Sequence, residues 1–538
     1  PTMPVPPKHS ALLCLTLGVA FLVPPAGAQP FPPTNGGNPG GAAGPAPAGR
    51  PGPGGGANAD FDSLIDLIIS TVAAETWAEN GGGEAEIRPY VNGVYADSRG
   101  VLRRYQAKTT GSLATDLKAA EARLGDVRTI AEQNPRSGDT NPRVAATLRC
   151  VSIGRLEREL QRRRIAKEPV DPAMLPLAGL RRVRYVIVLP PEADKPGDVV
   201  LAGPAGDWRV LGDGRIVASD TGEAVVRLDD LITLVRRTWA ASGGAFGCSI
   251  NPRPEALAAA QTFLNEWQTK SVSARRRDAW LEELRAHVGQ QDIEVFGIDP
   301  TSRAAGVLVE ADHHMKLVGL GLAEATPGIE NYLDGLANSP QSQSASTGVL
   351  RWWFAMSYKA IHAAPEGDAF ELIGPGAKVM SEKEMLTERG KRVAAGGDPI
   401  AEGFASAFSR HFGTLCRKYP VYSELRNVFD LSLAVELAHA AAGKNPGAWR
   451  PTLLVDARRL PMPAYEPAKT VETVVNHRTV NRRKFVAGVS GGVWGDARQL
   501  LVTKREAAQP DSYGPLGQRP IAPPDDLSAR QWWWDAAE

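Results

Sequence analysis

Two adjacent histidines, His313 and His314, follow Asp312 in the stretch EADHHMK, and these residue types could hold a metal ion or supply a catalytic base. The preceding run, AAGVLVEAD, predicts a strand, whose successive side chains point to opposite faces of a sheet. On that prediction, only Asp312 and His314 share a face, which gives two ligands where zinc needs at least three. We therefore expect a strand leading into a turn, and no metal site.

Two further residues could act as nucleophiles. Ser490 lies in GVSGG, which matches the Gly-x-Ser-x-Gly elbow; the elbow needs a helix after the serine, and an acid and a histidine further along. A β-like stretch follows instead, and no histidine lies beyond His477, so a glycine-rich bulge in a strand explains GVSGG better. Cys248, in FGCSINP, is expected in a turn before a helix, where a thiolate would be activated. We favour instead a small apolar residue packed under the turn.

A pair of carboxylates, Asp229 and Asp230, opens the helical pattern LDDLITLVRR. Paired carboxylates can share a proton and serve as acid and base. We interpret them instead as a helix N-cap, where acidic residues are favourable. GPAGDW has too few glycines for a phosphate-binding loop, so no cofactor is predicted.

The elements that must position these residues alternate between strands and helices. Residues 81–102 predict two short strands around Asn92-Gly93, a strong hairpin signal, and residues 181–211 predict a second hairpin. The periodicity at 398–415 and 419–443 is helical. Local hairpins mixed with helices predict an α+β fold rather than a doubly wound parallel sheet.

The N-terminal residues predict export. Lys8 and His9 precede an apolar run at 11–23, and the small residues 26–28 offer a cleavage site. At the other end, Trp532 to Trp534 form an aromatic cluster in a Pro-rich tail, expected to fold back onto the protein or to dock on a partner. We divide the chain into a signal peptide at 1–28, a disordered linker at 29–59, a helix–hairpin module at 60–107, a helical connecting region at 108–176, an α+β core at 177–390, a helical segment with a terminal β piece at 391–505 and a disordered tail at 506–538.

Charge and cysteine content narrow the classes of partner. The 538 residues carry 61 Lys and Arg against 60 Asp and Glu. Because this net charge is close to zero, we predict no nucleic-acid partner. The arginines at 162–164 lie in a helical pattern and are expected on a solvated face. Cys150, Cys248 and Cys416 remain after signal removal, either as one disulfide plus a free thiol or as three buried thiols. No later stretch is long and apolar enough to predict a membrane span.

A series of stretches, in order from residue 93 to residue 437, carries a resemblance: GVYADSRGVLRR (93–104), LRCVSIGRLEREL (148–160), LAGLRRVRYVIVLP (177–190), GDVVLAGPAGDW (197–208), GCSINPRPEAL (247–257), ADHHMKLVGLGLA (311–323) and YPVYSELRNVFDLSLAVEL (419–437). In these the chain resembles an uncharacterised family of exported planctomycete proteins, defined by a domain of unknown function that covers roughly 90–500. The preceding stretch at 61–82 is similar to a small module of planctomycete envelope proteins and, in its helix–hairpin outline, to the short N-terminal domains of secretins. The resemblance implies export and carries over no functional residue.

Two function classes follow from these patterns. The first is an exported, periplasmic or cell-surface protein that binds or assembles with envelope proteins without catalysis, through a ligand site that the sequence does not identify. The second is an exported hydrolase that uses Cys248, or Ser490 with His477. We favour the first, because no motif brings a nucleophile and a base together.

Overall fold

The computed structural model describes residues 86–90, 93–97, 107–108 and 141–536, with gaps at 193–194, 212, 241–243, 268–275, 340–348, 387–391, 395–397, 481–482, 508–511 and 513–522. The predicted signal peptide, the linker and the helix of the N-terminal module lie outside these residues. Within them, helices accompany two large mixed sheets, so the fold is α+β, as predicted.

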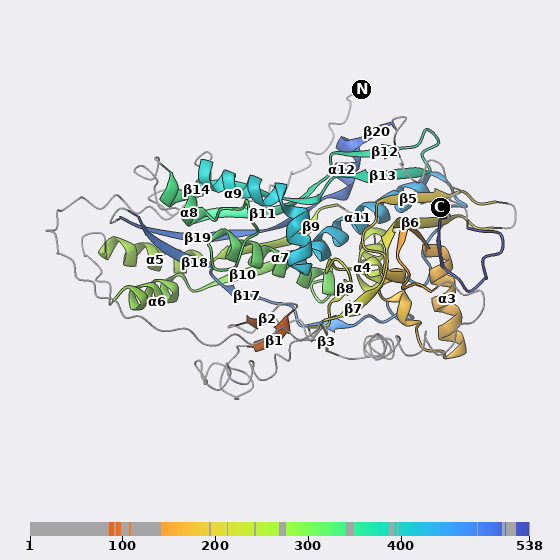
Figure 1. The fold of residues 1–538 in the computed structure, drawn as a ribbon, viewed down its shortest axis with the longest axis horizontal. Helices are drawn as coiled ribbons and strands as arrows, with labels where there is room; N and C mark the ends of the chain where they lie inside the picture. The colour runs from red at the N-terminus through yellow and green to blue at the C-terminus, as the bar shows by residue number, and fades with distance from the viewer. Residues whose placement is uncertain are drawn as a thin grey trace, which may run out of the picture.

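One half of the molecule, on the left of Figure 1, is built on an eight-stranded sheet in the order β15-β14-β11-β19-β9-β10-β17, with β18 also paired to β19. Among the described strands of this sheet, β11 and β19 form the one parallel pair. The strands are β9 (Phe246–Pro252), β10 (Gln290–Phe296), β11 (Val349–Ser357), β14 (Gly376–Leu386), β15 (Arg392–Ala394), β17 (Thr470–Glu472), β18 (Val475–Val480) and β19 (Arg483–Gly495).

The other half contains a seven-stranded sheet in the order β20-β12-β13-β5-β6-β4-β21. Its centre is the antiparallel pair β5–β6, which confirms the hairpin predicted at 181–211. Both edge strands, β20 and β21, come from the C-terminal end of the chain. The strands are β4 (Ala146–Ser152), β5 (Tyr185–Leu189), β6 (Asp198–Ala205), β12 (Ala360–Ala363), β13 (Ala369–Ile373), β20 (Arg505–Ala507) and β21 (Trp533–Asp535).

Three two-stranded pairs make up the rest of the sheets in the part of the chain that the structure describes. β1 (Glu86–Tyr90) pairs antiparallel with β2 (Gly93–Asp97), which confirms the first predicted hairpin. β3 (Ala107–Lys108) pairs with β16 (Ala464–Tyr465), so a segment near the N-terminus lies beside one near the C-terminus. β7 (Trp208–Val210) pairs with β8 (Ile216–Ala218).

The long helix α11 lies between the two sheets in Figure 1 and packs against β14 of one and β5 of the other, as well as against α4 and α7. Nearly all of its residues are buried. The helices predicted at 398–415 and 419–443 are confirmed as α9 to α11. None of the described helices combines the length and the apolar character needed to cross a membrane. The helices are α3 (Ile153–Ala166), α4 (Leu228–Trp239), α5 (Pro254–Glu266), α6 (Arg277–Val288), α7 (Arg303–Gly319), α8 (Tyr332–Asn338), α9 (Pro399–Arg410), α10 (Phe412–Lys418), α11 (Pro420–Lys444) and α12 (Ala497–Lys504).

Buried charges on α11 connect it to its surroundings. A buried charge is tolerated only where a partner compensates it. Each of these side chains therefore has an opposite charge on another element: Glu424 with Arg303 at 2.7 Å and Arg215 at 3.0 Å, Arg426 with Glu223 at 3.1 Å, Asp430 with Arg182 at 2.9 Å, and Glu436 with Arg498 at 3.0 Å.

The strand predicted for AAGVLVEAD is wrong, because these residues belong to α7. Ser302 caps the helix, its hydroxyl accepting a hydrogen bond from the Ala305 amide at 3.2 Å. Buried residues surround α7 on most sides, so its apolar residues show no one-sided helical period, and the β-branched Val307 and Val309 imitate a strand.

Two other expectations need correction. The region 108–176, expected to be helical, contributes α3 but also the strand β4. The tail predicted as disordered at 506–538 is ordered in much of its described part: residues 506–507 belong to β20, which pairs with β12, and β21 pairs antiparallel with β4. Trp532, Trp533 and Trp534 are 3%, 6% and 3% exposed, which confirms the prediction that they fold back onto the protein.

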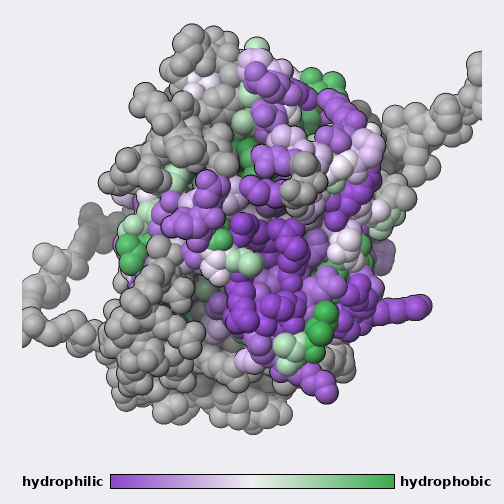
Figure 2. Space-filling model, turned by 90° about the vertical axis from the view of Figure 1, so that its right-hand side faces the viewer, coloured by the Kyte–Doolittle hydropathy of each residue, from purple (hydrophilic) through white to green (hydrophobic). Residues whose placement is uncertain are grey.

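The side of the molecule on which α3 lies is mostly hydrophilic in its described part (Figure 2). Arg162 and Arg163 of α3 both pair with Glu159, at 2.7 and 2.8 Å, and Arg162 also pairs with Glu168 at 2.6 Å. The arginine run is therefore a solvated helix face, as predicted.

Candidate functional site

The histidine pair lies on α7, and His314 faces aromatic residues. Its Nδ1 is 2.7 Å from the hydroxyl oxygen of Tyr422 on α11, and its ring centroid is 4.4 Å from that of Tyr419. Burial, together with the charges of Arg215 and Lys418, lowers the pKa of His314 to about 4. The imidazole is therefore neutral at pH 7. Within the described ranges, no group of three or more His, Cys, Asp or Glu side chains could hold a metal ion.

The EADHHMK and GVSGG stretches meet in the core. Asp312 Oδ1 accepts a hydrogen bond from the Gly492 amide on β19 at 2.8 Å, and Asp312 Oδ2 lies 2.6 Å from Lys316 Nζ. The side chains of this ion pair are 0% and 1% exposed. Glycine at position 491 allows β11 and α7 to lie close to β19, because a Cβ there would overlap the Trp352 carbonyl oxygen and lie 3.1 Å from Asp312 Oδ1. A Cβ at position 492 would likewise overlap the Cys248 carbonyl oxygen, so the last two glycines of GVSGG serve packing.

The structure does not bring the predicted nucleophiles and base together. Ser490 is fully buried within β19, and its hydroxyl lies 3.4 Å from the Leu350 carbonyl oxygen. His477 lies on β18 opposite Val486, further along the same sheet. A serine enclosed between paired strands cannot reach a substrate.

Cys248 lies within β9, not in a turn as predicted, although α5 begins soon afterwards at Pro254, as expected. It pairs with Val493 on one side and Val295 on the other. Burial, and then the charge of Asp312, raises the pKa of the thiol above its usual value, so no thiolate forms at neutral pH. Cys150, Cys248 and Cys416 are three free, buried thiols.

Asp229 and Asp230 lie in the first turn of α4 and do not cap it; the N-cap position is Arg227, which makes no side-chain cap hydrogen bond. Arg227 instead binds Asp229 through two hydrogen bonds, of 3.0 and 2.8 Å, while Asp230 pairs with Arg303. Burial, opposed by Arg303 and reinforced by Asp229, raises the pKa of Asp230 to about 6. For Asp229, the guanidinium groups of Arg227 and Arg303 outweigh burial and lower the pKa.

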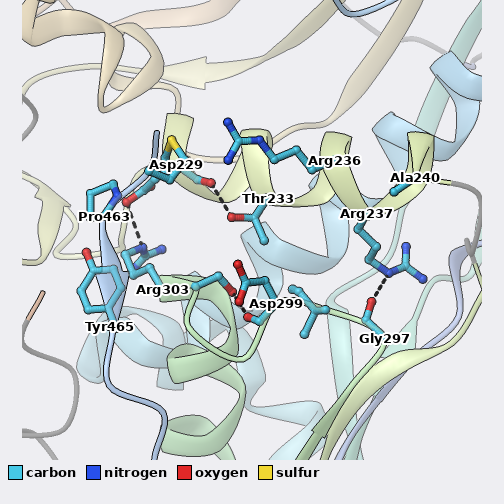
Figure 3. Close-up of a pocket in the computed structure, with 13 residues that line it drawn as sticks. Asp229, Thr233, Arg236, Arg237, Ala240, Gly297, Asp299, Arg303, Pro463 and Tyr465 are labelled. Carbon is cyan, nitrogen blue, oxygen red and sulfur yellow. Dashed lines mark hydrogen bonds and ion pairs between the residues drawn. The ribbon is translucent and has the colours of Figure 1, made fainter. Parts of the chain in front are cut away.

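A cavity of about 320 Å³ lies between α4 and the segment that leads from β10 into α7; we call it the α4–α7 pocket. Figure 3 shows the residues of α4 along one wall and those of the 297–303 segment facing them. Residues 462–465, which end in β16, close one side. The lining residues are Asp229, Thr233, Arg236, Arg237, Ala240, Gly297, Ile298, Asp299, Ser302, Arg303, Met462, Pro463 and Tyr465.

Hydroxyl and carboxylate groups of the pocket are largely engaged within the protein. Thr233 donates to the Asp229 carbonyl at 2.8 Å, and Ser302 donates to the Asp299 carbonyl at 2.6 Å. The Asp299 carboxylate accepts from the Thr301 amide and hydroxyl, at 2.9 and 2.7 Å. The pocket therefore contains fixed binding groups and neither a cysteine nor a histidine.

Sequence analysis did not predict this pocket. Its α4 wall repeats polar residues at helical spacing, in Asp229, Thr233 and Arg236, a stripe that could have marked one face of the helix. The opposite wall is a loop whose position depends on the fold of α7, which was predicted as a strand.

Residues 248–332 match the family described as protein of unknown function (DUF1598). The chain thus carries this domain of unknown function, and the matched segment runs from β9 through the 297–303 wall of the pocket and α7 to the first residue of α8. No curated protein and no solved structure matches the chain.

Proposed function

We propose that this protein is an exported, non-catalytic binding module of the cell envelope, which presents the α4–α7 pocket to a small ligand. The signal pattern at residues 8–28 supports export. The observation that carries the proposal is the distribution of reactive groups. Cys248 and Ser490 are buried in the eight-stranded sheet, whereas the pocket is lined by guanidinium, hydroxyl, apolar and carboxylate groups, and its carboxylates are bound by Arg227 and Thr301.

The size and rigidity of the pocket support a binding role. A volume of about 320 Å³ falls at the lower end of the range of small-molecule sites, about 300–1,000 Å³. Its walls are fixed by hydrogen bonds between elements, such as Tyr465 N to the Thr301 carbonyl at 2.8 Å. A preformed site loses little conformational entropy when a ligand binds. β16 pairs with β3, so Ala107, the last residue of the predicted N-terminal module, lies beside Tyr465 at the rim of the pocket.

Fractionation of cells that carry the tagged full-length chain tests the location, and a chain found in the cytoplasm would contradict it. Native mass spectrometry after incubation with a small-molecule extract of envelopes tests the binding role. We expect a compound to bind and to be released chemically unchanged. Conversion of the bound compound, abolished by Cys248→Ala or Ser490→Ala, would instead support the hydrolase.

A further inference from the structure

Arg236 lines the α4–α7 pocket and is held there by backbone carbonyls. Arg236 donates from Nε to the Leu454 carbonyl at 2.9 Å and from Nη2 to the Leu460 carbonyl. Among the described residues, no carboxylate forms an ion pair with Arg236, and its Nη1 group has no hydrogen-bond partner. The two carbonyls hold the guanidinium in place without neutralising it.

Arg237 adds a second cation that is only partly compensated. Its Nε donates to the Gly297 carbonyl at 2.7 Å, and its Nη1 lies 3.7 Å from Glu436. Glu436 is already bound by Arg498 at 3.0 Å. Burial lowers the pKa of both Arg236 and Arg237, and nearby carboxylates, Asp299 and Asp456 for Arg236 and Glu436 and Asp496 for Arg237, oppose this effect only in part.

The carboxylates of the pocket offset this positive charge only in part. Asp229 is neutralised by Arg227. Asp299 accepts from the neutral amide and hydroxyl of Thr301 and keeps its charge, and Asp299 and Asp456 act on Arg236 at a distance, without a direct ion pair. An anionic ligand would therefore gain a direct contact with an open guanidinium donor. Ile298, Met462 and Pro463 add apolar surface beside these charges.

We propose that the α4–α7 pocket binds a small organic anion, a carboxylate or a phosphate monoester on an apolar or ring-shaped body, through Arg236. Hydrogen bonds from a guanidinium to either group are charge-assisted and stronger than neutral ones. This inference rests on the proposed binding function and names the class of its ligand.

Isothermal titration calorimetry of the full-length protein with benzoate, phenyl phosphate and the neutral analogue benzamide tests the proposal. We expect both anions to bind and benzamide not to bind. Arg236→Gln should weaken anion binding by about tenfold or more, because a charge-assisted hydrogen bond is lost. Arg253→Gln is the matched control, because Arg253 lies outside the pocket in an exposed pair with Asp292 and should leave binding unchanged.

A second variant keeps the test decisive if Arg236→Gln fails to fold. Ala240→Trp places a large side chain at the pocket wall without removing any charge, and should also abolish anion binding. Equal binding of benzamide and benzoate, failure of both anions to bind, or wild-type affinity in Ala240→Trp would overturn the anion site. Release of phenol from phenyl phosphate would overturn only the non-catalytic function. Tighter binding of phenyl phosphate supports a phosphate ligand, and tighter binding of benzoate supports a carboxylate.

Discussion

At the scale of single residues, burial determines the protonation state of several titratable side chains in this protein. Cys150 and Cys416 illustrate this: burial is the main reason that the pKa of each thiol is raised to about 12. The same residue types in a solvated cleft would titrate much closer to neutral pH. Residue type alone therefore did not identify a functional site. The proposed anion site follows instead from the position of Arg236 in the α4–α7 pocket and from its hydrogen-bond partners.

Thiol labelling provides a prediction at this scale. Iodoacetamide should modify Cys150, Cys248 and Cys416 very slowly in the native protein, because each is buried and protonated, and rapidly in denaturant. Peptide mass spectrometry assigns the modification site by site. Rapid native labelling of Cys248 would contradict its inert role and revive the thiol-hydrolase alternative.

His314 predicts a pH dependence. Its pKa is about 4 in the folded protein and about 6.5 when unfolded, so protonation favours the unfolded state. Its contribution to stability is complete above pH 6.5 and is lost as the pH falls from 6.5 to 4. Relative to wild type, His314→Gln should reduce the loss of unfolding free energy between pH 6.5 and pH 4 by about 3 kcal/mol, measured by urea unfolding. Parallel profiles for the two proteins would show that His314 does not titrate as described.

At the scale of elements, helices and strands were predicted correctly where a single periodic pattern or turn signal dominates the segment. The β5–β6 hairpin and the helices α9 to α11 follow from strong turn signals and long helical periods. α7 was missed because neighbours cover it on most sides, which removes the polar stripe that marks a surface helix. Its cap at Ser302 and the pair Asp312–Lys316, four residues apart, were the helical signals available.

The close packing around β19 predicts that replacing two of its glycines by alanine costs very different amounts of stability. In Gly491→Ala, the new Cβ would overlap the Trp352 carbonyl oxygen and lie 3.1 Å from Asp312 Oδ1. We expect a loss of about 3 kcal/mol or more, or failure to fold. In the control Gly488→Ala, the nearest atom is Val475 Cγ2 at 3.7 Å, an ordinary contact, and the change should stay within about 1 kcal/mol. Chemical denaturation compares the two, and equal losses would refute the close-approach explanation.

At the scale of the whole molecule, the pairing of β21 with β4 joins segments that are far apart in the sequence. Arg149 of β4 is fully buried and binds Asp535 through two hydrogen bonds, of 2.7 and 2.9 Å. Its guanidinium also stacks 4.5 Å from the ring centroid of Trp533. The sequence predicted that the tryptophans pack on the protein, but the partner strand could not be predicted, because its position depends on the complete sheet.

Deleting residues 530–538 should therefore destabilise the protein by at least about 5 kcal/mol. The variant loses three buried tryptophans, worth about 1.5–3 kcal/mol each, and leaves Arg149 without its carboxylate. Thermal unfolding measures the loss. A synthetic peptide of residues 526–538, added in trans, should restore part of it, and a scrambled peptide should not. Unchanged thermal stability in the deletion would contradict the role of β21.

This closure also sets the time at which the chain can finish folding during synthesis. Arg149 and Asp535 are 386 positions apart. Because a ribosome adds about 5–20 residues per second, the edge of β4 stays unpaired for roughly 20–80 s during synthesis. An uncovered strand edge is prone to pair with other chains. For the exported chain that we propose, the same delay favours passage through a translocation channel, because the partner strand of β4 becomes available only after residues 533–535 have been made.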